Sequence, residues 1–198
     1  MGSTTLFLAC ALLLGPAAQA GRRAKQAEAP VAAEPTQPAG FTAVEVVSVL
    51  PAGGGGGTVL LANIERTQVI PIGVGGTEAL SIALRAERRR YERPLTHDLL
   101  DTVIGELGGE LTQVRIDDLR SQVFVATITL QQGEDSKRVD LRASDAIALA
   151  LGNGLPIWMA DGVLAETGIP WADFIAPPDL EPEELELELE APAPQPQL

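Results

Sequence analysis

The chain has 198 residues, with 14 Lys and Arg against 27 Asp and Glu, a formal net charge of −13 at pH 7, one His and one Cys. These counts exclude a disulfide framework and a metal centre built from several His and Cys side chains. The acidic balance excludes a general attraction to nucleic acid, so nucleic-acid binding depends on a local basic patch or a bound cation.

The first 40 residues predict export followed by a spacer. An apolar run at residues 6–14 precedes Ala-Gln-Ala at 18–20, the small-x-small pattern of a signal-peptidase site. We therefore expect residues 1–20 to be a signal peptide and the protein to be periplasmic or secreted, with no integral membrane span after cleavage. A lipid anchor at Cys10 is the alternative. Residues 21–40 are rich in Ala and Pro and predict a linker.

The C-terminal end predicts a disordered acidic tail at residues 176–198. Its last 22 residues hold seven acids and no base, with prolines on both flanks. Residues 183–190 (EELELELE) alternate with the period of a strand, so docking of this segment on a partner is the alternative. Residues 41–175 remain, a length typical of one domain with its own core.

Within residues 41–175, segments with strand and helix periodicity follow one another. The pattern predicts strands grouped before and after helices, which favours a single α+β domain of mixed strands and helices over a regular βαβ winding. In chain order we expect strands at 41–50, 58–64 and 67–74, helices at 77–91 and 96–107, strands at 111–119, 122–131 and 137–142 with a hairpin turn at 132–135, a helix at 144–151, a strand at 156–160 and a helix at 161–167.

Five consecutive glycines occupy residues 53–57. A glycine-rich loop can hold phosphate through its backbone N–H groups. Here no Lys-Ser/Thr pair follows, and a strand comes next instead of a helix. We therefore expect a hairpin connection at this point and no phosphate loop.

Four motifs occur together, in order: IPIGVGGTEALSIAL (70–84), RPLTHDLL (93–100), IDDLRSQVFVATITL (116–130) and DLRASDAIALAL (140–151). With this spacing, residues 44–169 resemble the bifunctional nuclease (BFN) domain family of bacteria and plants. The resemblance implies a BFN-like α+β fold, frequent homo-oligomers, and activity on both DNA and RNA.

The chain departs from the family pattern in three places near these motifs. Thr77 and Ala143 stand where the family usually has Pro, and residues 123–125 read Val-Phe-Val where it has Thr-Phe-Tyr. These differences concern the local geometry of the motifs and leave the expected fold unchanged.

Three expected helix starts share one form: Thr77-Glu78, Thr96-His97-Asp98 and Ser144-Asp145. Each places a hydroxyl at an expected N-cap and an acid in the first turn, where the carboxylate meets the positive end of the helix. Capping alone accounts for this pattern. The functional alternative is that the starts converge into one site.

The functional alternative assigns chemistry to these side chains. His97 could activate water or protonate a leaving oxygen, and ionised carboxylates at helix starts suit Mg²⁺ or Mn²⁺ together with substrate phosphate oxygens. The expected catalytic residues are Glu78, His97, Asp98, Asp140, Arg142 and Asp145, and the expected ligands of the divalent cation are Asp98, Asp117, Asp118 and Asp145.

The segment AERRRYER is the one basic patch of the domain in the sequence. Arg85, Arg88, Arg89 and Arg93 could contact phosphates of DNA or RNA while Tyr91 stacks on a base; arginines that simply face water near a helix end are the alternative.

The function expected from the whole chain is a nuclease that hydrolyses phosphodiester bonds of DNA and RNA. No Walker loop or nucleophile elbow demands an enzyme. The alternative is a non-catalytic binding or regulatory module, or a structural oligomer, on the same fold.

Overall fold

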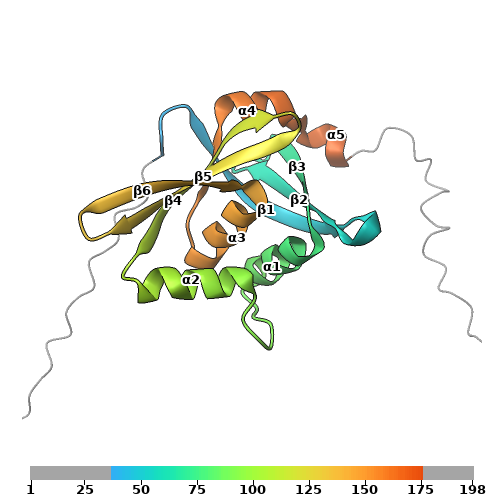
Figure 1. Ribbon diagram of the computed structural model, residues 1–198. Helices are drawn as coiled ribbons and strands as arrows, with labels where there is room; N and C mark the ends of the chain where they lie inside the picture. The colour runs from blue at the N-terminus through green and yellow to red at the C-terminus, as the bar shows by residue number, and fades with distance from the viewer. Residues whose placement is uncertain (1–36, 176–198) are drawn as a thin grey trace, which may run out of the picture. The chain divides into compact units, whose positions relative to one another are not determined.

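The computed structural model describes residues 37–175. The signal peptide, most of the linker and the acidic tail expected from the sequence lie outside the described residues. The elements are β1 (Phe41–Pro51), a 3-10 turn (Gly53–Gly55), β2 (Gly57–Asn63), β3 (Gln68–Val74), α1 (Gly76–Ala86), α2 (Thr96–Glu106), β4 (Glu110–Arg120), β5 (Val123–Gln132), β6 (Asp135–Arg142), α3 (Ala143–Asn153), β7 (Ile157–Ala160), α4 (Asp161–Thr167), β8 (Ile169–Pro170) and α5 (Trp171–Ile175) (Figure 1).

All eight strands belong to one sheet, in the order β6-β5-β4-β7-β1-β2-β3-β8. Neighbouring strands are antiparallel except β4 and β7, which run parallel. Hairpins join β1 to β2 across the glycine run and β5 to β6 across Gly133, whose φ of 59° suits glycine. The expected α+β domain and both hairpins are confirmed.

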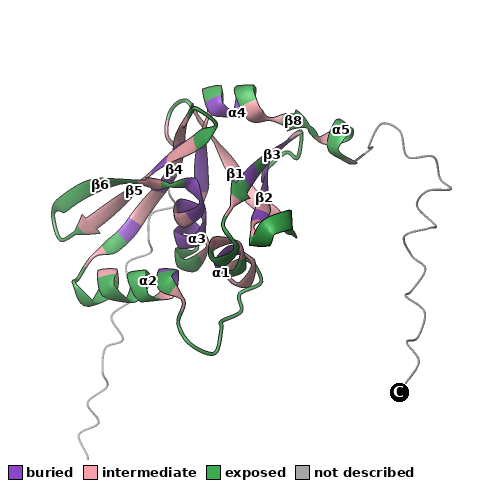
Figure 2. Cartoon of the chain, turned by 45° about the vertical axis from the view of Figure 1, so that its right-hand side comes forward, coloured by how far each residue is buried: buried purple, intermediate pink, exposed green. Residues whose placement is uncertain are grey.

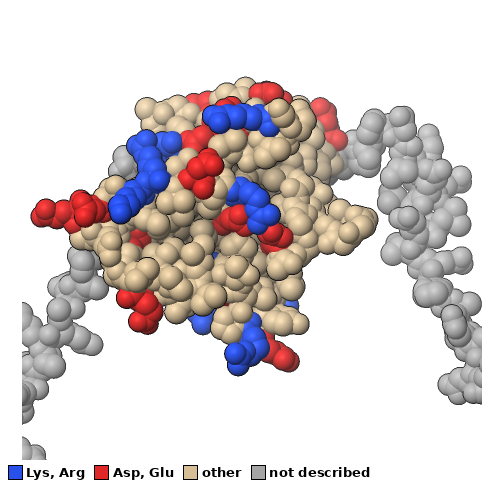
Figure 3. Space-filling model, viewed as in Figure 1, with Lys and Arg blue, Asp and Glu red and all other residues tan. Residues whose placement is uncertain are grey.

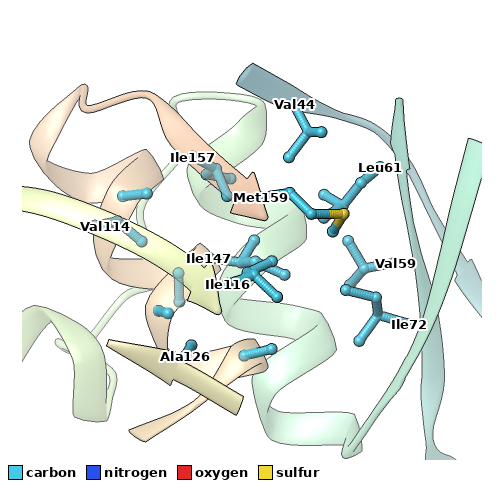
Figure 4. Close-up of a cluster of buried hydrophobic side chains, with 14 of the residues drawn as sticks. Val44, Val59, Leu61, Ile72, Val114, Ile116, Ala126, Ile147, Ile157 and Met159 are labelled. Atoms are coloured by element: carbon cyan, nitrogen blue, oxygen red, sulfur yellow. The ribbon is translucent and has the colours of Figure 1, made fainter. Parts of the chain in front are cut away.

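Helix α3 lies at the centre of the domain, because its sequence is apolar on nearly every side. Seven of its 11 residues are buried, and it contacts α1, α2 and the strands β4, β5 and β6. Side chains from across the sheet gather around Ile147 of this helix, among them Val59, Ile72, Ile116 and Met159 (Figure 4). The core therefore fills the space between the sheet and α3, and it fixes where α3 begins.

Helix α2 is the opposite case. His97 is its one buried residue, while Leu99, Leu100, Val103 and Leu107 beside it are exposed (Figure 2). An amphipathic helix normally buries its apolar stripe. Helix α2 therefore inserts His97 into the domain at its N-terminal end and leaves most of its apolar stripe in solvent.

Helix α1 is shorter than the sequence predicts, and the expectation of a helix to residue 91 is wrong. It ends at Ala86, where the amides of Arg88 and Arg89 turn back to the carbonyl groups of Arg85 and Leu84 and Arg88 adopts a φ of 56°. A continued helix would place Arg88 and Arg89 three and four residues after Arg85, where like charges repel one another. The short elements β8 and α5 are additional to the expected ones.

None of the helices within residues 37–175 is long and apolar enough to cross a membrane.

Candidate functional site

The three helix starts expected to meet do so, but without hydroxyl caps. The N-cap residues are Gly75, Leu95 and Arg142, and no side chain caps any of the three helices through its hydroxyl. Each N-cap lies one or two residues before the expected one. Thr77, Thr96 and Ser144 therefore lie inside the first turn, and the hydroxyl-cap prediction is wrong.

The acids of the three motifs all occupy the third helical position, where they have different partners. Asp98 Oδ2 accepts a hydrogen bond of 2.9 Å from the backbone N–H of Leu95, the acid half of a capping box. Glu78 folds back over Gly75, where an added Cβ would lie 2.6 Å from Glu78 Oε2. Asp145 turns away from its own backbone toward Arg142 and His97.

Arg142 joins the start of α1 to the start of α3. Its Nε donates to Asp145 Oδ2 over 2.8 Å, and its Nη2 donates to Asp145 Oδ1 over 2.8 Å and to Glu78 Oε1 over 2.6 Å. The Arg142 side chain is 63% exposed, whereas the two carboxylates are largely covered. One exposed cation thus holds two acids that lie 64 and 3 residues away in sequence.

His97 links all three helices from inside. Its Nδ1 lies 2.9 Å from Ser81 Oγ of α1, and its Nε2 lies 3.2 Å from Asp145 Oδ1 of α3. The His97 side chain is 8% exposed, and Ser81 is buried. Both ring nitrogens already have protein partners, so in this geometry His97 faces neither solvent nor open space.

The carboxylates of this group are held in their ionised form. A hydrogen bond to its own backbone amide and another from Arg142 lower the pKa of Glu78. Burial alone raises the pKa of Asp145, but hydrogen bonds from Arg142 and His97 and the charge of Arg142 outweigh it and lower the pKa. The same contacts raise the pKa of Arg142. We name these four side chains, Glu78, His97, Arg142 and Asp145, the Arg142 cluster.

A cavity of about 540 Å³ opens beside Arg142. Its walls come from four separate stretches of chain: 52–58 around the glycine hairpin, 72–75 at the end of β3, 122–124 at the start of β5, and 142–144 at the start of α3. Glycine backbone, the N-cap residue of α1 and the first two residues of α3 line it. Helix starts carry partial positive charge, so this part of the wall suits an anion.

Comparison with known proteins decides the family. Residues 59–172 match the model of the bifunctional nuclease domain. The chain belongs to the bifunctional nuclease domain family. It is also 38% identical over 111 residues to uncharacterised proteins from two strains of Mycobacterium tuberculosis, a match that covers 56% of this chain and 66% of each relative, slightly under two thirds of their length. The family match confirms the resemblance found in the motifs and includes every residue of the Arg142 cluster.

A second charged group of this BFN domain surrounds Arg85. Its side chain is 7% exposed and pairs at 2.8 Å with both Asp98 and Asp101, and it donates to the carbonyl of Ala148. Arg85 therefore ties α1 to α2 and α3 with its side chain covered, unlike the later arginines with which the sequence groups it as a phosphate contact. Burial on its own raises the pKa of Asp98. The hydrogen bond from the Leu95 amide and the charge and hydrogen bond of Arg85 outweigh burial, so the pKa lies below its ordinary value.

The remaining candidates for metal binding and catalysis in the BFN domain do not join the cluster. Asp117 pairs with Arg115 and Asp118 with Arg120, and Asp140 is exposed on β6. Between residues 37 and 175, no three His, Cys, Asp or Glu side chains group in a way that could hold a metal. The expected ligands Asp98, Asp117, Asp118 and Asp145 are thus not brought together.

The basic segment after α1 is exposed. Arg88, Arg89 and Arg93 all face solvent, as does Tyr91, and Arg89 pairs with Glu87. On the face seen in Figure 3, basic side chains lie beside acidic ones and form no continuous basic surface. The role of these arginines in nucleic-acid binding stays a prediction.

Sequence reasoning missed Ser81 and the cavity. Ser81 sits in an apolar helix face, and its one signal is its place one turn after Glu78. The cavity gave no signal, because four stretches distant in sequence build it.

Proposed function

We propose that this BFN domain is a nuclease that hydrolyses phosphodiester bonds of DNA and RNA, with the Arg142 cluster as its active site. The observation that carries the proposal is the meeting of one exposed arginine and two ionised carboxylates beside a cavity at two helix starts. Phosphoryl transfer needs these parts: a cationic group for phosphate oxygens and anionic groups that orient the attacking water.

Arg142 binds the scissile phosphate in this proposal. A guanidinium presents several donors in a plane and can bind two phosphate oxygens at once. Because the Arg142 side chain is mostly exposed, it can turn from Glu78 toward the cavity while Asp145 still contacts it. The helix starts at Gly76 and Ala143 add partial positive charge where negative charge develops on the phosphate.

Glu78 and Asp145 orient the attacking water. Both are ionised near neutral pH, so each accepts a hydrogen bond from a water molecule. One of them takes the water proton as the water oxygen bonds to phosphorus and the P–O bond to the leaving sugar oxygen breaks, and the carboxyl group then returns that proton to the leaving oxygen. His97 acts as a positioning residue, because it holds Asp145 through Nε2 and is itself held by Ser81. Proton abstraction from water by His97 is not part of this proposal, since both of its ring nitrogens already contact Ser81 and Asp145.

Glu78 and Asp145 are also the residues that would hold a divalent cation. Their oxygens Oε1 and Oδ1 converge on one atom, Nη2 of Arg142, at 2.6 and 2.8 Å. Two carboxylates plus phosphate oxygens suffice for Mg²⁺, so the pair fits a cation once Arg142 has turned to the phosphate. A bound cation would supply Lewis-acid polarisation of the phosphate and a more acidic water.

Digestion assays test the proposal. Purified protein should cleave DNA and RNA, and cleavage should respond to Mg²⁺, Mn²⁺ and chelator. Asp145→Asn should lower the rate on the order of 100-fold or more, as loss of a group that acts in the transition state does. The matched control Asp173→Asn changes an exposed acid of α5 and should keep wild-type activity. Equal rates for Asp145→Asn and wild type would point to a contaminating nuclease and sink the proposal.

One observation favours a second candidate, a non-catalytic module that binds nucleic acid. Every ionisable group of the Arg142 cluster already has a protein partner. A cluster whose ionisable groups all have protein partners also suits a site that binds a phosphate without cleaving it. Binding of DNA or RNA that Arg142→Gln abolishes, with no cleavage under any metal condition, would favour this candidate.

A further inference from the structure

The cavity beside Arg142 has an apolar inner wall. Ile72, Val74 and Phe124 line it, and Val74 and Phe124 pack against the core while remaining only partly buried. Part of each side chain therefore faces open space. Partly exposed aromatic and aliphatic surface next to a phosphate-binding cation is the combination that holds single nucleic-acid strands, because bases stack on such surface.

The cavity has the size for a nucleoside. Its volume of about 540 Å³ falls within the roughly 300–1,000 Å³ of small-molecule pockets. Gly73 lines it without a side chain, and a Cβ added there would meet no atom within 4 Å. Neither close packing nor a positive φ requires a glycine at position 73. The absence of a side chain there keeps the space beside β3 open.

The wall also offers backbone hydrogen-bonding groups. Strand β3 pairs with β2 along one side, but on its other side β8 covers only Gln68 and Val69. Within the part of the chain that the structure describes, the remainder of that edge, residues 70–74, pairs with no strand, and residues 72–74 line the cavity. The exposed residue Gln122 also lines the cavity. These groups can bind the polar edge of a base.

We propose that the cavity receives an unpaired nucleobase while Arg142 holds the adjacent phosphate, so that the substrate class is single-stranded nucleic acid. The inference rests on the proposed function and specifies its substrate. A base inside a duplex is stacked and paired, and taking it out costs a few kcal/mol. A concave, partly apolar pocket thus discriminates against duplexes, whereas a flat basic surface binds both forms.

Binding measurements with the full chain test this inference. The probes are a fluorescent oligodeoxythymidylate, the same oligomer with abasic residues in place of its bases, and a hairpin duplex of equal length. We expect the single strand to bind on the order of 10-fold more tightly than the other two, since stacking one base contributes that much. The abasic probe keeps every phosphate and requires no change in the protein.

Two variants locate the base. Gly73→Val should fill part of the cavity and lower affinity for the single strand on the order of 10-fold, with little effect on the duplex. Ser136→Val is the matched control, because it adds the same side chain to an exposed strand position outside the cavity lining. Phe124→Leu should act in the same direction as Gly73→Val, and thermal melting shows whether each variant is folded.

The outcomes separate this inference from the proposed nuclease. Equal affinity for normal and abasic probes, or no binding at all, overturns the base pocket. Cleavage of single strand and duplex at equal rates also overturns it but leaves the nuclease standing. Preference for the single strand without cleavage keeps the pocket and removes the nuclease.

Discussion

At the scale of single residues, the Arg142 cluster and Asp98 of the group around Arg85 link stability to pH. Glu78, Asp98 and Asp145 all have pKa values lowered in the folded protein, from ordinary values near about 4.3 for Glu and about 3.9 for Asp. A lowered pKa means that the folded state binds these protons less readily than the unfolded chain. The contribution to stability is therefore complete above about pH 5 and declines as the pH falls through the folded pKa values.

We expect the melting temperature to be flat from pH 7 to about pH 5 and to fall below that. Asp145→Asn should flatten the acid limb of the curve, because Asn has no proton to gain. Calorimetric scans at a series of pH values measure both. An acid limb that is unchanged in Asp145→Asn would show that Asp145 is not held ionised by Arg142 and His97.

Ser81 provides a second test at this scale. Ser81→Ala removes the partner of His97 Nδ1 and leaves a buried ring nitrogen without a hydrogen bond, which costs about 1–3 kcal/mol. We expect the free energy of unfolding in urea to fall by about that amount. Ser136→Ala, at an exposed position, should change it little. An unchanged value for Ser81→Ala would mean that His97 does not depend on the Ser81 hydroxyl.

At the scale of elements, close contact between the glycine hairpin and the start of α1 positions Glu78. A Cβ added to Gly76 would collide with the carbonyl oxygen of Gly55, a backbone atom that no rotamer change can move away. Gly76→Ala should therefore push α1 from the hairpin and destabilise the protein by about 1–3 kcal/mol. Gly73→Ala has open space and should be neutral. Thermal melting compares them, and equal melting temperatures would contradict the contact.

The exposed face of α2 fits the expectation of a homo-oligomer drawn from the family resemblance. Leu99 and Leu107 are 59% and 68% exposed, with Leu100 and Val103 between them. Packing of this apolar stripe against a second copy of the chain would remove its side chains from water. If such an oligomer forms, Leu99→Glu with Leu107→Glu should reduce its size in light scattering while the circular dichroism is retained. An unchanged size would place the contact elsewhere or show that none exists.

The comparison of sequence and structure has a physical pattern. Strand and helix positions followed from apolar periodicity, which acts within each segment, and the bounds agree within one or two residues for most elements. Apolar periodicity did not predict the end of α1, because repulsion between arginines and local turn formation oppose the helix after Ala86. The cluster itself was only partly predictable. Its residue types were visible at helix starts, but the pairing of Arg142 with Glu78 joins positions 64 residues apart.

At the scale of the whole chain, charge opposes the proposed substrate. Residues 177–198 hold seven acids and no base, so deleting them changes the net charge from −13 to −6. Nucleic acid is repelled by negative charge, and the repulsion is screened by salt. If the tail is a solvated acidic segment as the sequence predicts, the deletion should strengthen binding of single-stranded oligonucleotide several-fold at low salt and hardly at all at high salt.

The melting temperature of the truncated chain should stay nearly unchanged, because such a segment buries little apolar surface. Anisotropy titrations at two salt concentrations and a thermal scan measure these effects. A drop of many degrees would instead mean that the Leu-Glu alternation at residues 183–190 is docked on the domain. A gain in affinity that persists at high salt would mean that the tail occupies the binding site directly.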